Sequence, residues 1–348
     1  METRVDPPGS GGRDTADAQR RVPAAPEDAR GPELPYPSGW FCLALSRELA
    51  PGRVLTRRFA GEDVVLYRTG DGRPHAVRPY CPHLGAHLGS GTVEGGNLVC
   101  PFHRFAFAPD GTCVHAPGGP APRARLEHHP LRERNGFVLV WRGHDATPPA
   151  WEIPEAPAAD ITPTAYWTAD VFTHVQDLAE NAIDYRHLPA LHGVAVEEIA
   201  PPRAEGPCLA GRLRMAPQRL PAMKKLMGDY SYALAGLGYF RTETSLPPLG
   251  LAIHMWAMNT PIAPRHTRML VAVACTAAEQ PQPSALPLLR RPLYRGVARA
   301  MLWAAAGALR DDVKIWNIKR YEPRPRLAAG DEAIGYYRRW ACQFYPPP

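Results

Sequence analysis

Hydrophobic and polar positions divide this chain of 348 residues into three parts. Residues 1–35 have no periodic pattern and are rich in Pro, Gly, Ala, Arg and Asp, which predicts a disordered tail. From residue 36 to 145 the apolar segments are short and β-like, as in Trp40–Leu45, Asp63–Arg68 and Phe137–Trp141. Such segments predict a small all-β domain over 36–145.

Residues 146–348 combine two patterns, and a proline-rich connection leads into them. Helix-like stretches are expected at about 174–188, 288–310 and 312–318, and strand-like runs at 209–215, 237–245, 250–259 and 266–276. Helices packed against an antiparallel sheet give an α+β domain of the helix-grip type. The whole chain is therefore expected to be α+β, with an all-β domain first.

Composition and charge exclude several classes of function. The formal net charge is +6 without clusters of Lys and Arg, which argues against a nucleic-acid partner. The apolar segment 296–309 is bounded by arginines and is too short for a membrane span. Glu2 and Asp6 argue against a secretory signal. The cysteines outside the motifs below are scattered and odd in number, which suits a reducing compartment. We expect a cytoplasmic protein.

Two short motifs offer the ligands of an iron–sulfur cluster. Cys81-x-His83 is followed by Cys100-x-x-His103, with 16 residues between His83 and Cys100. In a Rieske centre two thiolates hold one iron of a [2Fe–2S] cluster and two imidazoles hold the other. Glycines around both motifs permit the tight turns that bring two loop tips together. These four residues are the expected cluster ligands.

A Cys2His2 zinc site is the competing interpretation of the same residues. Zinc fingers usually place both cysteines before both histidines, whereas the order here is Cys-His, Cys-His. The order favours the cluster. A zinc-bound structural protein stays the alternative, and it would be colourless and lack acid-labile sulfide.

A second group of candidate ligands lies near the middle of the chain. Asn181, Asp184 and His187 are spaced i, i+3, i+6 and are expected near one helical face. Pro189 is expected to break the helix, which lets His192 return beside His187. Two imidazoles and a carboxylate form the facial triad that holds Fe(II) and leaves positions open for O2.

The carboxylate of such a triad has to come from another part of the chain. The pair Asp311-Asp312 is the best source. Alone, two histidines five residues apart would usually be core or surface residues, and two adjacent aspartates a charge pair at a helix start. Together they gain weight, because a one-electron cluster in the same chain needs an electron acceptor.

With these motifs, the chain resembles the oxygenase component of a Rieske non-haem iron oxygenase over nearly its whole length from Trp40 to Tyr345. Beyond the cluster motifs, the resemblance rests on Glu180-Asn181-x2-Asp184-x2-His187-x4-His192 and on Asp312 four residues before Trp316. It implies that His187, His192 and Asp312 hold the catalytic iron, with Asp311 next to the ligands.

The same resemblance implies an assembly and partners. Asp184 would bridge His187 to His103 of a neighbouring subunit, which implies a homotrimer. Glu180 and Asn181 would support the site. A separate ferredoxin or flavin reductase would deliver electrons from NAD(P)H to the cluster, and the iron would activate O2 beside a hydrophobic small-molecule substrate.

Several runs resemble the steroid-acting branch of the family, the ketosteroid 9α-hydroxylases and cholesterol 7-desaturases: 81–88, 149–155 and 337–345. This implies hydroxylation or desaturation of a steroid-like or secondary-metabolite substrate. Residues 113–118 and 312–317 also resemble aminopyrrolnitrin oxygenase, so N-oxygenation of an arylamine is the alternative. A Rieske electron carrier is the rival from another class, and it would need only residues 40–145.

The residues after His103 depart from the pattern of the family. His103 is followed by Arg104-Phe105, where many members of the family have Gly-Trp.

Apolar stretches at 217–240 and 250–258 are expected to supply pocket walls, although core packing would explain about half of their large side chains equally well. These side chains are Met223, Met227, Tyr230, Tyr232, Tyr239, Met255, Trp256 and Met258.

Overall fold

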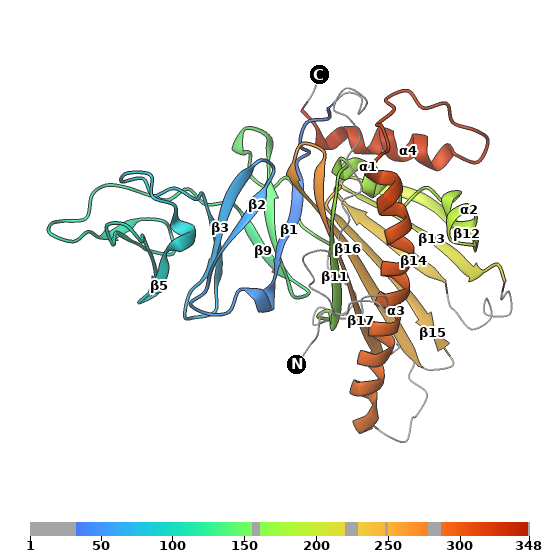
Figure 1. Cartoon of the computed structure of the whole chain (residues 1–348), viewed down its shortest axis with the longest axis horizontal. Helices are drawn as coiled ribbons and strands as arrows, with labels where there is room; N and C mark the ends of the chain where they lie inside the picture. The colour runs from blue at the N-terminus through green and yellow to red at the C-terminus, as the bar shows by residue number, and fades with distance from the viewer. Residues whose placement is uncertain (1–32, 155–160, 220–228, 248–249, 278–286, 347–348) are drawn as a thin grey trace, which may run out of the picture. The chain divides into compact units, whose positions relative to one another are not determined.

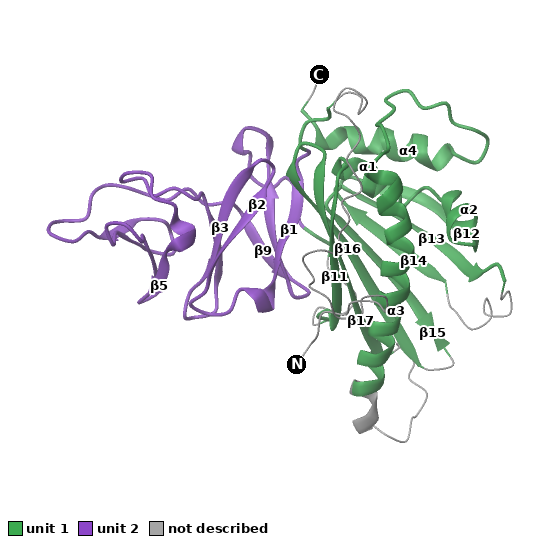
Figure 2. Ribbon diagram, viewed as in Figure 1, with its two compact units in different colours: residues 1–36, 153–348 green, residues 37–152 purple. Residues whose placement is uncertain are grey.

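The computed structural model divides the chain into two compact units (Figures 1 and 2). One unit is residues 37–152, and the other is residues 153–348 together with residues 1–36. The described residues are 33–154, 161–219, 229–247, 250–277 and 287–346. The predicted disordered tail therefore lies almost entirely outside the described residues. Within them, no helix is both long and apolar enough to cross a membrane.

The unit of residues 37–152 consists of three small antiparallel sheets with the strand orders β1-β10-β9, β2-β3-β4 and β5-β6-β7-β8. Their bounds are β1 Gly39–Leu45, β2 Val54–Phe59, β3 Glu62–Arg68, β4 Pro74–Val77, β5 Thr92–Glu94, β6 Asn97–Val99, β7 Ala106–Phe107, β8 Cys113–His115, β9 Leu131–Arg134 and β10 Phe137–Arg142. The all-β prediction and the three expected strands are confirmed.

The β9–β10 hairpin is the element of this unit that follows most directly from its local sequence. Asn135 and Gly136 form its two-residue turn with φ values of 49° and 75°, which is the left-handed pair that a type I′ turn requires. Four consecutive residues of β10 are fully buried. Trp141 at its end meets Trp40 of β1 edge-on, with 5.4 Å between ring centroids. A continuous apolar run after an Asn-Gly turn thus forms the core strand of this sheet.

The second unit is built on a seven-stranded antiparallel sheet with the order β11-β17-β16-β15-β14-β13-β12. The strands are β11 Ala165–Val171, β12 Val194–Glu205, β13 Cys208–Pro217, β14 Tyr230–Ala235, β15 Tyr239–Leu246, β16 Leu251–Ala263 and β17 His266–Ala277. The helices are α1 Val175–Glu180, α2 His187–Leu191, α3 Pro287–Trp316 and α4 Glu332–Ala341. This arrangement confirms the α+β prediction.

The long helix α3 covers one face of this sheet (Figure 1). Ala298, Leu302 and Ala306 of α3 pack against Trp167 of β11 and Val271 of β17 in one buried cluster. Side chains alternate between the two faces of a strand, so the register assigns every neighbouring residue to one face or the other. The face that α3 covers is called the α3 face below.

The strand register places the residues that were expected to line a pocket on two different faces of the sheet. Met255 packs in the α3 cluster, and it stands opposite Thr242, which stands opposite Tyr232. Met255, Tyr232 and also Tyr230 therefore lie on the α3 face. Tyr239, Trp256 and Met258 lie on the other face, where the Trp256 indole donates to the Tyr239 hydroxyl at 3.2 Å. Met223 and Met227 are outside the described residues.

Two helix predictions are wrong in their boundaries. The expected helix over 174–188 is two short helices, α1 and α2, with residues 181–186 between them, so Asn181, Asp184 and His187 do not share a helical face. Pro189 lies inside α2 and does not end it. The helices expected at 288–310 and 312–318 are the single helix α3.

Buried charges attach α1 to the C-terminal part of the chain. The Glu180 carboxylate accepts from Arg338 Nε at 2.6 Å and from its Nη2 at 3.1 Å. Asp177 accepts from Lys319 Nζ at 3.2 Å and from the Thr173 hydroxyl at 2.9 Å. Both acids are buried, so each depends on its cation for compensation. These contacts hold the six-residue α1 in place.

Substitution of Arg338 tests this attachment. Arg338→Gln should lower the free energy of unfolding by about 3 kcal/mol, because Glu180 is left buried beside only Lys319. Arg339→Gln is the matched control: its side chain is exposed, and its effect should stay within about 0.5 kcal/mol. Urea unfolding of both variants measures the difference. Equal stabilities would show that the Glu180–Arg338 pair does not hold α1.

Candidate metal centres

Two loops of the first unit carry the predicted cluster ligands, and both loops close with the same pair of backbone bonds. The residue four positions after each cysteine donates its N–H to the cysteine carbonyl. The cysteine N–H donates to the carbonyl five positions ahead. The two distances are 2.9 and 2.9 Å in the loop of Cys81, and 3.2 and 2.8 Å in the loop of Cys100. Each motif thus forms a turn that presents its cysteine and histidine together.

The residue four positions after each cysteine has a left-handed backbone in both loops. Gly85 occupies it in the first loop with φ 76°, and Arg104 in the second with φ 57°. A left-handed backbone suits glycine and is uncommon for other residues. Arg104 adopts it while its Nη2 donates to Glu94 at 2.7 Å. The departure from Gly-Trp is therefore accommodated by a non-glycine residue in a left-handed turn.

The side chains of the predicted cluster ligands differ in their burial. Cys81 and Cys100 are buried, whereas His83 is exposed and its ring lies 4.7 Å from that of His103. Phe105 stacks on His83 with 4.3 Å between ring centroids. Burial raises the pKa of the Cys81 thiol to about 11, so binding of a metal there would release a proton. Two buried sulfur donors beneath two outer imidazoles fit the donor set of a Rieske cluster.

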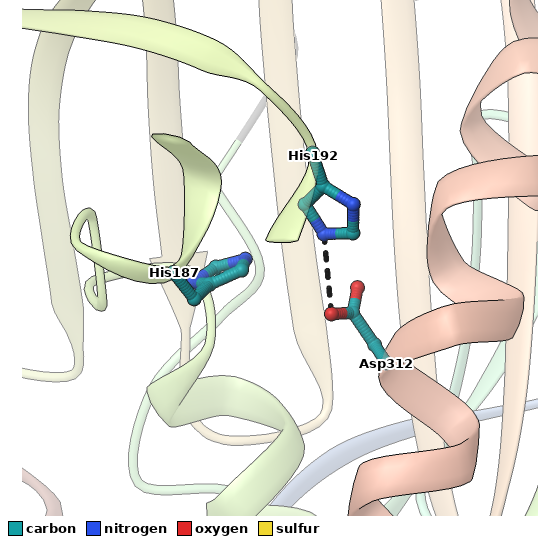
Figure 3. Close-up of side chains that lie close together, drawn as sticks. All are labelled: His187, His192 and Asp312. Atoms are coloured by element: carbon teal, nitrogen blue, oxygen red, sulfur yellow. Dashed lines mark hydrogen bonds and ion pairs between the residues drawn. The ribbon is translucent and has the colours of Figure 1, made fainter. Parts of the chain in front are cut away.

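The second centre lies in the other unit, where His187, His192 and Asp312 converge (Figure 3). One ligand atom from each lies within 4.8 Å of the other two. His192 Nε2 and Asp312 Oδ1 are 3.2 Å apart, and the two imidazole rings are nearly perpendicular. His187 begins α2, His192 follows it, and Asp312 belongs to α3. The structure therefore brings together all three residues predicted to hold iron.

His187 is oriented by the backbone of Asp184. A carbonyl oxygen only accepts, so the His187 Nδ1–H donates to it, at 2.5 Å. This fixes the tautomer and leaves Nε2 for a metal, as is usual for metal-binding histidines. The Asp184 carboxylate lies 3.7 Å from the same Nδ1 and is one-third exposed. The predicted Asp184–His187 contact is present, and the carboxylate remains accessible from outside the chain.

The two adjacent aspartates have different surroundings. Asp311 is exposed and accepts from Lys314 Nζ at 2.7 Å. Asp312 is 5% exposed, and its burial raises the pKa of the carboxyl, while His192 and His187 oppose that shift. A buried carboxylate needs a cation or hydrogen-bond donors. Two imidazoles and one buried carboxylate form a donor set that fits Fe(II).

Glu180 and Asn181 contact other parts of the chain. Glu180 is paired with Arg338, as described above. Asn181 caps the C-terminus of α1, and its N–H donates to the Ala179 carbonyl. These contacts involve none of the three converging residues, and the support expected of Glu180 and Asn181 stays a prediction.

Sequence reasoning missed a hydroxyl contact next to this centre. Tyr185, two residues before His187, bonds through its hydroxyl to the hydroxyl of Tyr232 on β14. Burial raises the pKa of Tyr185 to about 12 and that of Tyr232 further, so both phenols stay neutral. The Tyr232 ring lies over Gly211, where a Cβ would come within 2.7 Å of the ring carbon that bears the hydroxyl. An unexplained glycine inside the expected strand 209–215 was the available signal.

Gly211→Ala tests whether this contact holds the ligand segment. Its new methyl group should displace Tyr232, lower stability by about 1–3 kcal/mol and reduce the iron retained after dialysis against a chelator. Gly307→Ala is the control, because nothing lies within 4 Å of its Cβ position on α3 and alanine favours a helix. Urea unfolding and iron analysis measure both. A Gly211→Ala variant as stable as Gly307→Ala would disprove the contact.

Comparisons with known proteins agree with this geometry. Residues 39–130 match the family model of the Rieske [2Fe-2S] domain, and residues 140–345 match that of the 3-ketosteroid 9alpha-hydroxylase C-terminal domain. Cholesterol 7-desaturase nvd of Bombyx mori is 30% identical over 94% of this chain and 74% of that protein. The probable 3-ketosteroid-9-alpha-monooxygenase oxygenase component of Rhodococcus rhodochrous is 25% identical over 96% of this chain and 85% of that protein.

Solved structures show the same fold. Dicamba monooxygenase bound to dicamba has a TM-score of 0.61 at 20% identity and covers 90% of this chain and 98% of its own. The NdmA QL mutant of Pseudomonas putida CBB5 with theobromine has a TM-score of 0.65 at 20% identity, with 87% and 88% covered. The match of the second family model to more than half of the chain excludes a simple electron carrier. The chain belongs to the Rieske non-haem iron oxygenases, O2-dependent oxidoreductases with a [2Fe–2S] cluster and Fe(II), in the branch of 3-ketosteroid 9α-hydroxylases and cholesterol 7-desaturases.

Proposed function

We propose that this protein is an oxygenase component that hydroxylates or desaturates a hydrophobic, polycyclic, steroid-like substrate. The observation that carries the proposal is the convergence of His187, His192 and Asp312 in a chain whose relatives include a cholesterol 7-desaturase and 3-ketosteroid 9α-monooxygenases. As an oxygenase component, it would receive electrons from NAD(P)H through a separate ferredoxin or flavin reductase. The absence of disulfides among the described residues supports a cytoplasmic location.

We assign the two metal groups to the ligand sets described above. Cys81, His83, Cys100 and His103 would hold the cluster in one domain. In the other, His187, His192 and Asp312 would hold the iron. When bound, the cluster supplies single electrons and the iron supplies the site at which O2 is reduced. The protein residues position these groups and the substrate.

The α3 face of the sheet is the proposed wall for the substrate. Tyr230, Tyr232, Thr242 and Met255 lie on this face together with Ile253. Burial raises the pKa of Tyr230 to about 12, so its hydroxyl stays neutral, and it bonds the Thr242 side chain. These five residues carry apolar side chains and a few hydroxyl groups and no charge. The Glu198 carboxylate of β12, on the same face, acts electrostatically on Tyr232. Such a surface binds a hydrophobic substrate by burying it, and its hydroxyl groups orient an oxygen atom of the substrate by hydrogen bonding.

We further propose that the chain works as a homotrimer in which each cluster serves the iron of a neighbour. Two exposed apolar groups support this. Tyr80, Leu84 and Phe102, which are 62%, 68% and 63% exposed, adjoin the cluster histidines in sequence. Near the iron ligands, Leu191 and Ile315 are also exposed. Exposed apolar patches of this kind mark interaction surfaces, and a contact between the two would bring His103 of one copy to Asp184 of the next.

A product screen tests the substrate proposal. The purified, cluster-loaded protein is supplied with a surrogate ferredoxin, its reductase and NADH, and then with panels of sterols, 3-ketosteroids and arylamines. Mass spectrometry should show a steroid that gains one oxygen or loses two hydrogens. Oxygen on an arylamine nitrogen would instead establish the alternative activity. Oxygen consumption without any steroid product would contradict the steroid assignment.

Asp184→Ala tests the bridge between subunits. This variant should retain both metals and lose turnover, because the carboxylate that joins the two imidazoles is gone. His83→Ala should lose the cluster and also be inactive. Coexpressed in mixed assemblies, the two variants should recover activity, because an intact cluster in one chain can serve an intact Asp184 in the next. Mixed assemblies without activity would place the whole electron path within a single chain.

A further inference from the structure

A groove of about 800 Å³ lies on the sheet face that points away from α3. It is formed by strands β12, β13, β14 and β15. Ser231, Ala233 and Arg241 line it, and they alternate along their strands with Tyr232 and Thr242, whose side chains lie on the α3 face. Tyr232 also borders the groove. The sheet therefore separates this groove from the candidate iron centre.

The hollow arises from small side chains and an irregular edge strand. Ala200, Ala210 and Ala233 line the groove together with Ser231, so little side-chain volume covers the backbone there. The pairing of β12 with β13 shifts register on both sides of Ala200. Pro201 and Pro202 follow, and proline cannot donate to a ladder. Bulges of this kind bend an edge strand and re-aim its side chains.

The groove carries an excess of positive charge. Arg203, Arg212 and Arg241 line it, and none of them forms an ion pair within the part of the chain that the structure describes. The Nη1 atom of Arg241 is buried and has no hydrogen-bond partner there. Buried donors without partners are rare in folded proteins, so this atom points to a missing acceptor.

The two acids of the groove offset this charge only in part. Glu243 Oε2 lies 3.5 Å from Nδ1 of the buried His254, and His254 and then Arg241 lower the pKa of the Glu243 carboxyl. Glu205 is exposed near the turn that joins β12 and β13. Three arginines thus accompany two carboxylates. Arg203, Arg212 and Glu205 are exposed, and Arg241 and Glu243 are half-buried in the groove.

We propose that this groove binds a small organic anion through its carboxylate or phosphate group. The planar guanidinium fork matches the paired oxygens of both groups, which makes arginine the preferred residue for such recognition. A volume of about 800 Å³ accommodates a molecule of nucleotide size. Ser231 supplies a hydroxyl donor next to the arginines. The site is independent of the proposed function, because it lies on the opposite face of the sheet.

Calorimetric titration of the full-length, assembled protein tests the proposal. Pyrophosphate, citrate and AMP are the probes, used at about 150 mM salt so that diffuse charge effects are screened. At least one probe should bind with a Kd below about 1 mM. Binding of pyrophosphate and AMP alone would identify a phosphate ligand, and binding of citrate alone a carboxylate ligand. No binding of any probe would overturn the proposal.

Three variants distinguish a specific anion-binding site from nonspecific attraction to positive charge. Arg241→Gln should weaken binding at least about tenfold, and Arg241→Lys by a similar factor, because lysine keeps the charge without the fork. Arg214→Gln is the control on the same strand as Arg212. Arg214 already pairs with Asp229 at 2.7 Å and lies outside the groove, so binding should not change. Full affinity in Arg241→Lys, or an equal loss in Arg214→Gln, would overturn the proposal.

Discussion

Two buried carboxylates on the six-residue helix α1 fix the position of the candidate iron centre. A helix this short does not hold together alone, so tertiary contacts have to stabilise it. Asp177 and Glu180 provide them through Lys319 and Arg338, which come from the chain after α3. The segment that follows α1 carries Asp184, His187 and His192, and α3 itself carries Asp312. One set of buried ion pairs therefore fixes both sides of the centre.

The two metal centres are assembled in different ways. Each cluster loop is a local turn, closed by bonds between residues four and five positions apart, and the two loops repeat the same design. The iron centre is non-local, because His192 and Asp312 are separated by 120 positions in the chain. It exists only after the sheet, α3 and the C-terminal segment have packed. The hydroxyl contact of Tyr185 with Tyr232 belongs to the same packing, since it connects the ligand segment to β14.

The error in the helix expected at 174–188 has a specific physical cause. In a continuous helix the Asp184 carbonyl would accept the N–H of Leu188. It accepts the imidazole of His187 instead, and Leu188 donates to Tyr185. By this point α1 has ended at Glu180 with Asn181 as its cap, and the His187 side chain occupies the acceptor that a continued helix would have used. The apolar periodicity of the segment carries no trace of that competition.

The sequence by itself determined the class of fold, the cluster motifs and the two histidines of the second centre, because ligand chemistry requires particular residue types at particular spacings. The Asn135-Gly136 turn and the core strand β10 were predictable for the same reason, since their causes are local. The choice of Asp312 from the pair Asp311-Asp312 rested on the resemblance to the family. Only the tertiary structure decided that Asp312 is buried while Asp311 is exposed, and that Tyr239, Trp256 and Met258 lie on the face away from α3. Burial and sheet register depend on partners far along the chain, and a pattern read along one segment does not contain them.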